Sequence, residues 1–249
     1  MRGIIMYEDL KKVIEGSSRI VFFGGAGVST ESGVPDFRSE NGLYKSVSEY
    51  GMPPEEIISL SFFRKNPDIF YKYYKENLMY PDARPNEAHF ALARLEAAGK
   101  LNAVVTQNVD GLHQMAGSKN VIQVHGSALR NYCMDCGALY SDEYILAPTV
   151  CSGHIPLCEK CNGTVRPDVV LYEESLDSDV ISAATGAIAK ADTLIVGGTS
   201  LVVYPAAGFL NYFRGANLVV INKSETAYDS RALIVINDSI GKVLGSVVD

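Results

Sequence analysis

The chain has 249 residues, of which 47% are hydrophobic and 20% charged, and this balance excludes a largely disordered protein. Its 29 acidic and 22 basic side chains give a net charge of −7. That charge argues against a broad nucleic-acid surface, but not against a basic protein as substrate.

The N-terminal segment 1–16 is predicted to be an amphipathic helix, with charges throughout. It lacks the apolar core of a signal peptide, and no apolar run in the sequence is long enough to span a bilayer. We therefore expect a cytoplasmic protein that neither enters a membrane nor binds nucleic acid directly.

Apolar runs with the composition of buried strands alternate with helical patterns along the chain. The predicted strands are residues 20–23, 101–106, 121–124, 193–196 and 218–221. The predicted helices between them are 86–98, capped by Asn86, 177–190, begun by Asp177, and 205–212. This alternation predicts an α/β fold with a doubly wound, Rossmann-like parallel sheet.

Two segments interrupt the alternation. Residues 39–85 are rich in Tyr, Phe and Pro and contain a predicted helix at 66–79, and residues 128–167 hold every cysteine. We interpret them as a helical insertion and a zinc-binding ribbon that build a smaller lobe. The prediction is one catalytic domain over 1–249, with its core at about 1–38, 86–127 and 168–249.

The glycine-rich turn after the first strand, GGAGVSTESGVPDFRS, begins at Gly24. Its glycines at 24, 25 and 27 let the backbone approach a phosphate, and residues 29–31 are predicted to open a helix whose amides favour an anion. Because the next glycine is Gly33, the spacing departs from G-x-G-x-x-G. Taken alone, the turn could also be an ordinary connection from strand to helix.

The cysteines form two C-x-x-C pairs about twenty residues apart, a spacing typical of a tetrahedral zinc site. The predicted ligands are Cys133, Cys136, Cys158 and Cys161. A third pair at the same spacing, Cys151 and His154, leaves the ligand set open from spacing alone. Four thiolates leave no open coordination position, so we expect the zinc to be structural.

A third polar cluster spans residues 106–113 and is followed by His125. Asn108 and Asp110 could bind an amide, Gln107 could reach a ribose hydroxyl, and His125 is suited to act as a general base. Alternatively, Asn108 and Asp110 could cap the helix that starts near Asp110.

Together these motifs resemble the sirtuins, a family of NAD-dependent protein lysine deacylases. The similar segments follow the family's order over nearly the whole chain: GAGVSTESGVPDFRS, TQNVDGLH, VHGS, the two C-x-x-C pairs, GTSLVVYPA and VIN. The resemblance implies that His125 is the catalytic base. It also implies a set of NAD contacts: Ala26, Thr30, Phe37, Arg38, Gln107, Val109, Asp110, Thr199, Ser200, Asn222 and Ile240.

The resemblance further implies that NAD is consumed as a co-substrate. The acetyl group of acetyl-lysine would pass to ADP-ribose, with release of nicotinamide and O-acetyl-ADP-ribose. The acylated peptide would add as an extended strand between residues 169–172 and 200–203, although both segments could be ordinary sheet strands. We expect a monomer with one structural zinc ion per chain.

The chain also departs from the family pattern. Many sirtuins have Phe-Gly-Glu where this chain has Tyr172-Glu173-Glu174, next to the expected peptide site. The helix that holds an arginine in sirtuins specific for acidic acyl groups has none at 70–76. Acetyl and longer apolar acyl groups are therefore the expected substrates.

Three alternatives remain at this stage. A protein ADP-ribosyltransferase would use the same pocket. A dehydrogenase would place an acidic residue about twenty residues after the glycine turn, at the end of a second strand, but here that distance falls inside the insertion, at 46–50. A non-enzymatic zinc-ribbon module would leave His125 and residues 107–110 without a role.

Overall fold

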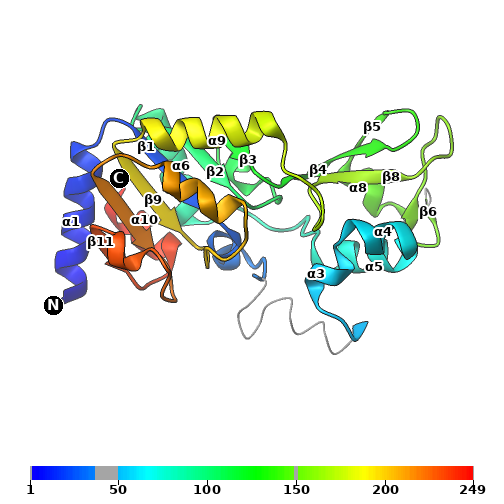
Figure 1. Ribbon diagram of the computed structural model, residues 1–249, viewed down its shortest axis with the longest axis horizontal. Helices are drawn as coiled ribbons and strands as arrows, with labels where there is room; N and C mark the ends of the chain where they lie inside the picture. The colour runs from blue at the N-terminus through cyan, green and yellow to red at the C-terminus, as the bar shows by residue number, and fades with distance from the viewer. Residues whose placement is uncertain (1, 37–49, 149–150, 249) are drawn as a thin grey trace.

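The core of the protein is a parallel β-sheet. The structure is a computed structural model that describes residues 2–36, 50–148 and 151–248. Six parallel strands lie in the order β11-β10-β9-β1-β2-β3 (Figure 1). They are β1 (Ile20–Gly24), β2 (Leu101–Thr106), β3 (Val121–Gln123), β9 (Thr193–Gly197), β10 (Asn217–Ile221) and β11 (Ile234–Ile236). Because the chain order reverses between β1 and β9, the predicted doubly wound fold is confirmed.

Helices cover both faces of this sheet. The helices on one face are α1 (Arg2–Gly16), α6 (Glu87–Ala97) and α10 (Ile240–Val247). Those on the other face are α9 (Ser178–Lys190) and the 3-10 helix η5 (Ala206–Tyr212). Side chains alternate along each strand, so Phe22 packs in the first apolar cluster and Phe23 in the second. Burial on both faces explains why the strands are continuous apolar runs.

The two predicted capping residues begin their helices as expected. The side chain of Asn86 accepts a hydrogen bond from the amide of Ala88 at 2.9 Å, at the start of α6. Asp177 accepts from the amides of Asp179 at 2.7 Å and Val180 at 3.1 Å, at the start of α9. Both caps satisfy amides that have no partner inside the helix.

A smaller lobe lies beside the sheet and is joined to it through β4 and β8 (Figure 1). Its strands are β4 (Gly126–Cys133), β5 (Leu139–Ser141) and β8 (Val165–Val169), in the antiparallel order β5-β4-β8, with the hairpin β6 (Cys151–Ser152) and β7 (Ile155–Pro156). Its helices are α3 (Pro54–Ile57), α4 (Leu60–Lys65), α5 (Pro67–Asn77) and α8 (Asp142–Leu146). An aromatic core holds the lobe together: Phe63, Phe70, Tyr71, Tyr73 and Tyr74. The single-domain assignment and its internal boundaries stay a prediction.

The prediction of a helix that opens at residues 29–31 of the glycine turn is wrong. Two 3-10 turns follow instead, η1 (Ala26–Val28) and η2 (Thr30–Ser32). Gly33, with a φ of 82°, ends the second of them. Backbone hydrogen bonds join this turn to the end of β9 and the loop after it, and the turn does not continue into an α-helix.

Other elements differ from the prediction in smaller ways. Strand β11 was not predicted, although it lies within the apolar run at 232–236. The segment predicted as a helix at 205–212 is the 3-10 helix η5. Two short elements complete the chain, α7 (Leu112–Met115) and η6 (Asp229–Arg231). Among the helices of the described ranges, none is long and apolar enough to cross a membrane.

Candidate active site

Most candidate residues follow the carboxyl ends of the parallel strands. Gln107 directly follows β2, His125 comes two residues after β3, and Thr199 comes two residues after β9. In open α/β sheets, ligands bind at this edge, where the strand order reverses. The reversal between β1 and β9 therefore marks the expected position of a dinucleotide.

Two glycine turns meet backbone to backbone at this point. A Cβ on Gly27 would lie 2.8 Å from the Cα and carbonyl oxygen of Gly198. Gly198 has a φ of 59°, and a Cβ there would lie 2.4 Å from the amide nitrogen of Val28. These glycines therefore serve first to join the turn after β1 to the turn after β9.

Gln107 bridges the same two turns through its side chain. Its Nε2 donates to Oγ1 of Thr199 at 3.1 Å and lies 3.4 Å from the carbonyl oxygen of Gly24. Ala26 and Thr30 lie half-buried on the 3-10 turns nearby. The structure thus brings together four of the predicted contact residues, from three different strand ends.

Asp110 joins a polar network that the sequence did not reveal. Its Oδ2 accepts from the hydroxyl of Ser29 at 2.6 Å, and Nδ2 of Asn108 donates to the same hydroxyl at 3.0 Å. Its Oδ1 accepts from the amide of Leu112 at 2.9 Å, at the start of α7. Oδ1 of Asp110 therefore caps the start of α7, while Oδ2 binds the Ser29 hydroxyl that also accepts from Asn108. Ser29 was not predicted as a site residue, although its place in the glycine turn was a signal.

His125 is held by one ring nitrogen. Its Nδ1 lies 3.1 Å from the carbonyl oxygen of Gln107. Because a carbonyl oxygen only accepts, the neutral ring carries its proton on Nδ1, and Nε2 is left as an acceptor. Burial lowers the pKa of His125 below its ordinary value of 6.5, although the hydrogen bond to Gln107 opposes this. The ring is therefore neutral at neutral pH.

The residues expected on the adenosine side follow β9 and β10 or, for Ile240, begin α10. Ser200 is exposed, and Asn222 directly follows β10, where its Nδ2 donates to the carbonyl oxygen of Ser224 at 2.8 Å. Ile240 is only 3% exposed and packs against Gly197, where its Cδ1 would lie 1.9 Å from an added Cβ. Their contacts with a nucleotide stay predictions.

Three predicted NAD contacts remain: Phe37, Arg38 and Val109. Phe37 and Arg38 lie outside the described residues. Val109 is half-buried and packs against the apolar cluster of the small lobe. Val109 thus lies where the sheet edge meets the small lobe.

Two other histidines are buried behind this edge. The ring centroids of His89 and His113 lie 4.7 Å apart, and both side chains are inaccessible to solvent. Burial lowers the pKa of His89 to about 4 and that of His113 to about 3. Both rings are neutral and packed, which leaves His125 as the better candidate for a base.

The four predicted cysteines come together in the small lobe. All four sulfurs lie within 4.8 Å of one another, with 3.4 Å between Cys133 and Cys161 and 3.6 Å between Cys136 and Cys158. Thiolates around a tetrahedral zinc ion are about 3.8 Å apart, given a Zn–S distance of about 2.3 Å. The cluster therefore fits zinc.

The two cysteine turns share one geometry. The amide of Gly137 donates to the carbonyl oxygen of Cys133 at 3.0 Å, and the amide of Asn162 to that of Cys158 at 2.8 Å. Gly137 has a φ of 71° and Asn162 a φ of 64°, values that glycine and asparagine tolerate. Each pair is thus presented by the same tight turn.

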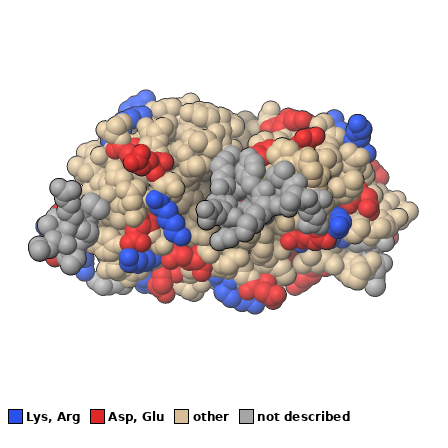
Figure 2. All heavy atoms as spheres, turned by 90° about the horizontal axis from the view of Figure 1, so that it is seen from below, with Lys and Arg blue, Asp and Glu red and all other residues tan. Residues whose placement is uncertain are grey.

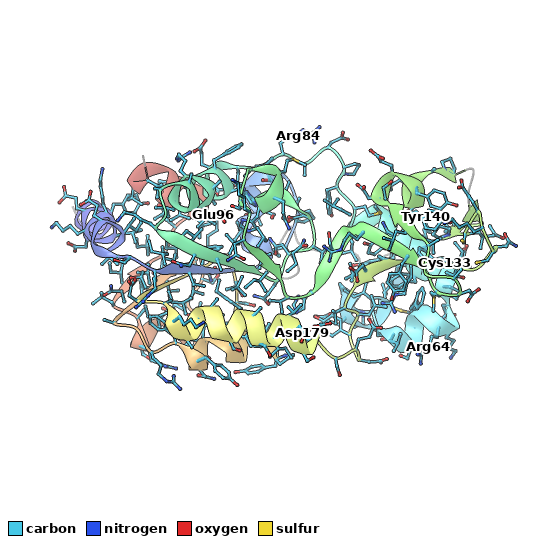
Figure 3. The ribbon with its side chains drawn as sticks, turned by 90° about the horizontal axis from the view of Figure 1, so that it is seen from above. Arg64, Arg84, Glu96, Cys133, Tyr140 and Asp179 are labelled. Atoms are coloured by element: carbon cyan, nitrogen blue, oxygen red, sulfur yellow. The ribbon has the colours of Figure 1, made fainter. Side chains whose placement is uncertain are left out.

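A tyrosine supports this cluster from outside. The hydroxyl of Tyr140 lies 3.0 Å from Sγ of Cys158 and accepts from the amide of Glu159 at 3.2 Å. Figure 3 shows Tyr140 and Cys133 together in the small lobe. Such contacts from outside the ligand set orient metal ligands.

His154 makes a different contact. Its Nδ1 lies 3.0 Å from Oδ2 of Asp68 in α5, and its amide donates to Oδ1 of Asp68 at 2.7 Å. This pair anchors the β6–β7 turn to α5. The side chain of Cys151 lies outside what the structure describes.

Comparisons with known proteins agree with this arrangement. The sequence model of the Sir2 family matches residues 25–205 of this chain. A protein from Clostridium perfringens (strain 13 / Type A) named NAD-dependent protein deacetylase is 62% identical over 241 residues, covering 96% of this chain and 97% of the relative. A protein of the same name from Clostridium acetobutylicum is 58% identical over 240 residues, covering 96% and 97%.

Solved structures give the same result. A Sir2 protein with a deacetylated p53 peptide and 3'-O-acetyl ADP-ribose superimposes with a TM-score of 0.87 at 38% identity, over 95% of both chains. A Sir2 homolog in complex with NAD reaches 0.86 at 38% identity, over 97% of this chain and 92% of that one.

The fold and the two sites define a Rossmann-like α/β protein with a four-cysteine ribbon. The matches over nearly the full length show that the chain belongs to the Sir2 family. The resemblance seen in the sequence motifs is therefore confirmed.

Proposed function

We propose that the protein is an NAD-dependent protein lysine deacetylase that transfers the acetyl group of acetyl-lysine to ADP-ribose and releases nicotinamide. The names of the relatives at 62% and 58% identity support this reaction. The observation that carries it is His125, a neutral, half-buried histidine at the carboxyl edge of the sheet whose Nε2 is left as an acceptor.

In this proposal His125 acts as the general base. The hydrogen bond from Nδ1 to Gln107 selects the tautomer and orients the ring. Nε2 can then accept the proton of a ribose hydroxyl, which becomes able to attack the acyl carbon. A lowered pKa keeps the base free of its proton at neutral pH.

The NAD contacts are assigned to the edge around His125. Gly25, Ala26 and Thr30 would face the phosphates, and Gln107, Val109 and Asp110 the nicotinamide and its ribose. The remaining contacts are assigned to Phe37, Arg38, Thr199, Ser200, Asn222 and Ile240. The polar groups of Ser29, Asn108 and Asp110 are already linked to one another, so they can orient an amide without rearrangement.

The peptide is proposed to bind along residues 169–172, opposite 200–203. The amide of Val170 donates to the carbonyl oxygen of His125 at 3.0 Å, so this segment runs past the base. In the second segment Val202 is 55% exposed, and Tyr204, which follows it, is 69% exposed. A substrate strand between the two segments would cover them.

Zinc has a structural role in this proposal. Cys133, Cys136, Cys158 and Cys161 would hold it, and when bound it cross-links the two cysteine turns of the ribbon. The cysteine cluster lies in the small lobe rather than at the sheet edge, which supports a role in folding.

Further parts of the proposal concern partners and location. On the face shown in Figure 2, Lys and Arg are scattered among Asp and Glu rather than gathered into one patch. Together with the net charge of −7, this supports a protein substrate rather than nucleic acid. We place the enzyme in the cytoplasm as a monomer, where thiolates remain available for zinc.

Mass spectrometry of an acetyl-lysine peptide incubated with the protein, with and without NAD, tests the proposal. Loss of acetyl in step with formation of nicotinamide and O-acetyl-ADP-ribose is expected. His125→Ala should abolish turnover while leaving zinc content and fold intact. Mass added to the protein substrate would indicate an ADP-ribosyltransferase instead, and turnover by His125→Ala would exclude the proposed base.

A further inference from the structure

Glu173 has a backbone conformation that is unusual for its residue type. Its φ is 75°, in the left-handed region, where a Cβ crowds the following carbonyl oxygen. Glycine and asparagine are common there, whereas long side chains are not. Such strain persists only where the surrounding structure holds it, and it clusters at binding sites.

The side chain of Glu173 is held at its far end. Oε2 accepts from the amide of Ser61 at 2.8 Å, and Oε1 accepts from the hydroxyl of Ser61 at 2.9 Å. Ser61 lies in the first turn of α4, where amides lack partners within the helix and favour a carboxylate. The helix's own cap, Ser59, uses the amide of Phe62, so Glu173 satisfies a different amide.

The backbone next to Glu173 joins the same two segments. The amide of Tyr172 donates to the carbonyl oxygen of Ile58 at 3.1 Å, and the amide of Leu60 donates to that of Tyr172 at 3.0 Å. The N–H and the C=O of Tyr172 therefore both have hydrogen-bond partners. Among the described residues, by contrast, the N–H and C=O of Glu173 have no backbone partner.

These contacts combine two properties in one residue. Within the described ranges, the main-chain groups of Glu173 have no backbone partner, and they come directly after segment 169–172, which runs past His125. Its side chain ties those groups to α4. Main-chain groups held in place are what an extended peptide needs in order to add to an edge, and fixing them in advance lowers the entropy lost on binding.

We propose that Glu173 is a positioning residue for the acylated peptide. Its bond to Ser61 holds its own N–H and C=O where the main chain of the substrate can pair with them. The inference rests on the proposed deacetylase function, and it assigns to this chain a peptide-side contact at the position where its motif departs from Phe-Gly-Glu.

Three variants separate this role from a general effect of charge. Glu173→Gly removes the carboxylate and tolerates the positive φ. Glu173→Gln removes the charge but keeps a side-chain oxygen that can accept from Ser61. Asp179→Asn, at an exposed carboxylate in the first turn of α9, removes a charge without touching α4.

The measurement is steady-state kinetics with an acetyl-lysine peptide and NAD. Glu173→Gly should raise the KM for the peptide about tenfold, with kcat and the KM for NAD changed less than about twofold. Glu173→Gln should raise the peptide KM less than about threefold, and Asp179→Asn should leave it unchanged. A normal peptide KM in Glu173→Gly would overturn the proposal, as would equal losses in all three variants.

Hydrogen exchange tests the contact without turnover. In Glu173→Gly, the amides of Leu60 and Tyr172 should exchange faster than in the wild-type protein, because their segments are no longer tied. Unchanged protection would overturn the proposal. Faster exchange in a protein whose wild type does not deacetylate would overturn the proposed function and the peptide role together, while leaving the contact with Ser61 established.

Discussion

The amide nitrogen of Gly27 lies 2.8 Å from the carbonyl oxygen of Gly198, and through this bond the turn after β1 rests on the turn after β9. The approach is possible only because neither residue has a side chain. The candidate NAD site is therefore built from two turns that depend on each other.

Gly27→Ala should damage both the fold and the site. The new Cβ would lie 2.8 Å from the backbone of Gly198, which cannot yield as a side chain could. We expect a loss of about 1–3 kcal/mol in the free energy of unfolding and a raised KM for NAD. Denaturant unfolding and kinetics measure these changes. Gly186→Ala in α9, with nothing within 4 Å of the added Cβ, is the control and should be neutral or stabilising. Equal behaviour of the two variants would contradict the close contact.

The pH dependence of kcat/KM should report His125. Burial lowers the pKa of His125, and the imidazole is neutral above that pKa and protonated below it. Activity should therefore fall on the acid side with a midpoint below pH 6.5, the ordinary value for histidine. A pH–rate profile checks this. An acid limb centred clearly above 6.5 would be inconsistent with His125 as a neutral base of lowered pKa.

Acid should destabilise the protein through His89 and His113. Their folded pKa values of about 4 and about 3 lie below the ordinary 6.5. Between pH 6.5 and pH 5 the unfolded rings bind protons that the folded rings do not, so stability present at pH 7 is lost as the pH falls. Each ring should cost about 1–2 kcal/mol over this window. Chemical denaturation of the wild type and His113→Leu at pH 7 and pH 5 measures it. The variant should lose less stability on acidification, and an equal loss would rule out His113 as a cause.

Asp110→Asn should separate the two roles of that carboxylate. The amide oxygen can still accept from Leu112, whereas the bond that Oδ2 accepts from Ser29 is altered. We expect near-normal stability with weaker NAD chemistry, and peptide binding less affected. Asp110→Ala, which loses both contacts, should also lower the melting temperature. Equal loss of NAD and peptide binding in Asp110→Asn would indicate that the residue acts only in folding.

Cys133→Ser should release zinc and lower the melting temperature, since a three-thiolate site binds zinc more weakly. Tyr140→Phe should retain zinc but release it faster to a chelator, because the hydroxyl contact with Cys158 is lost. Metal analysis, thermal unfolding and a colorimetric chelator assay measure these effects. His154→Ala is the matched control, because that side chain pairs with Asp68, and it should keep its zinc. Zinc loss in His154→Ala would reopen the ligand set.

Local chemistry made much of this protein predictable. Five of the six strands of the main sheet, all but β11, were recognisable because both faces are buried, so their residues form continuous apolar runs. Asn86 and Asp177 were recognisable as caps, and the cysteine pairs as ligands, because each acts within a few residues of itself. The family, and with it the NAD chemistry, followed from motifs of the same short range.

Contacts between distant segments could not be read from the chain. Ser29 meets Asp110, Gly27 meets Gly198, and Glu173 reaches Ser61 only once the strands are ordered and the small lobe is packed. Their geometry depends on the summed packing of many residues rather than on any local pattern. For the same reason the glycine turn, whose composition suggested a helix, forms 3-10 turns against its neighbour. The sequence determined which residue types follow each strand, whereas the packing of the fold determined which of their side chains face one another.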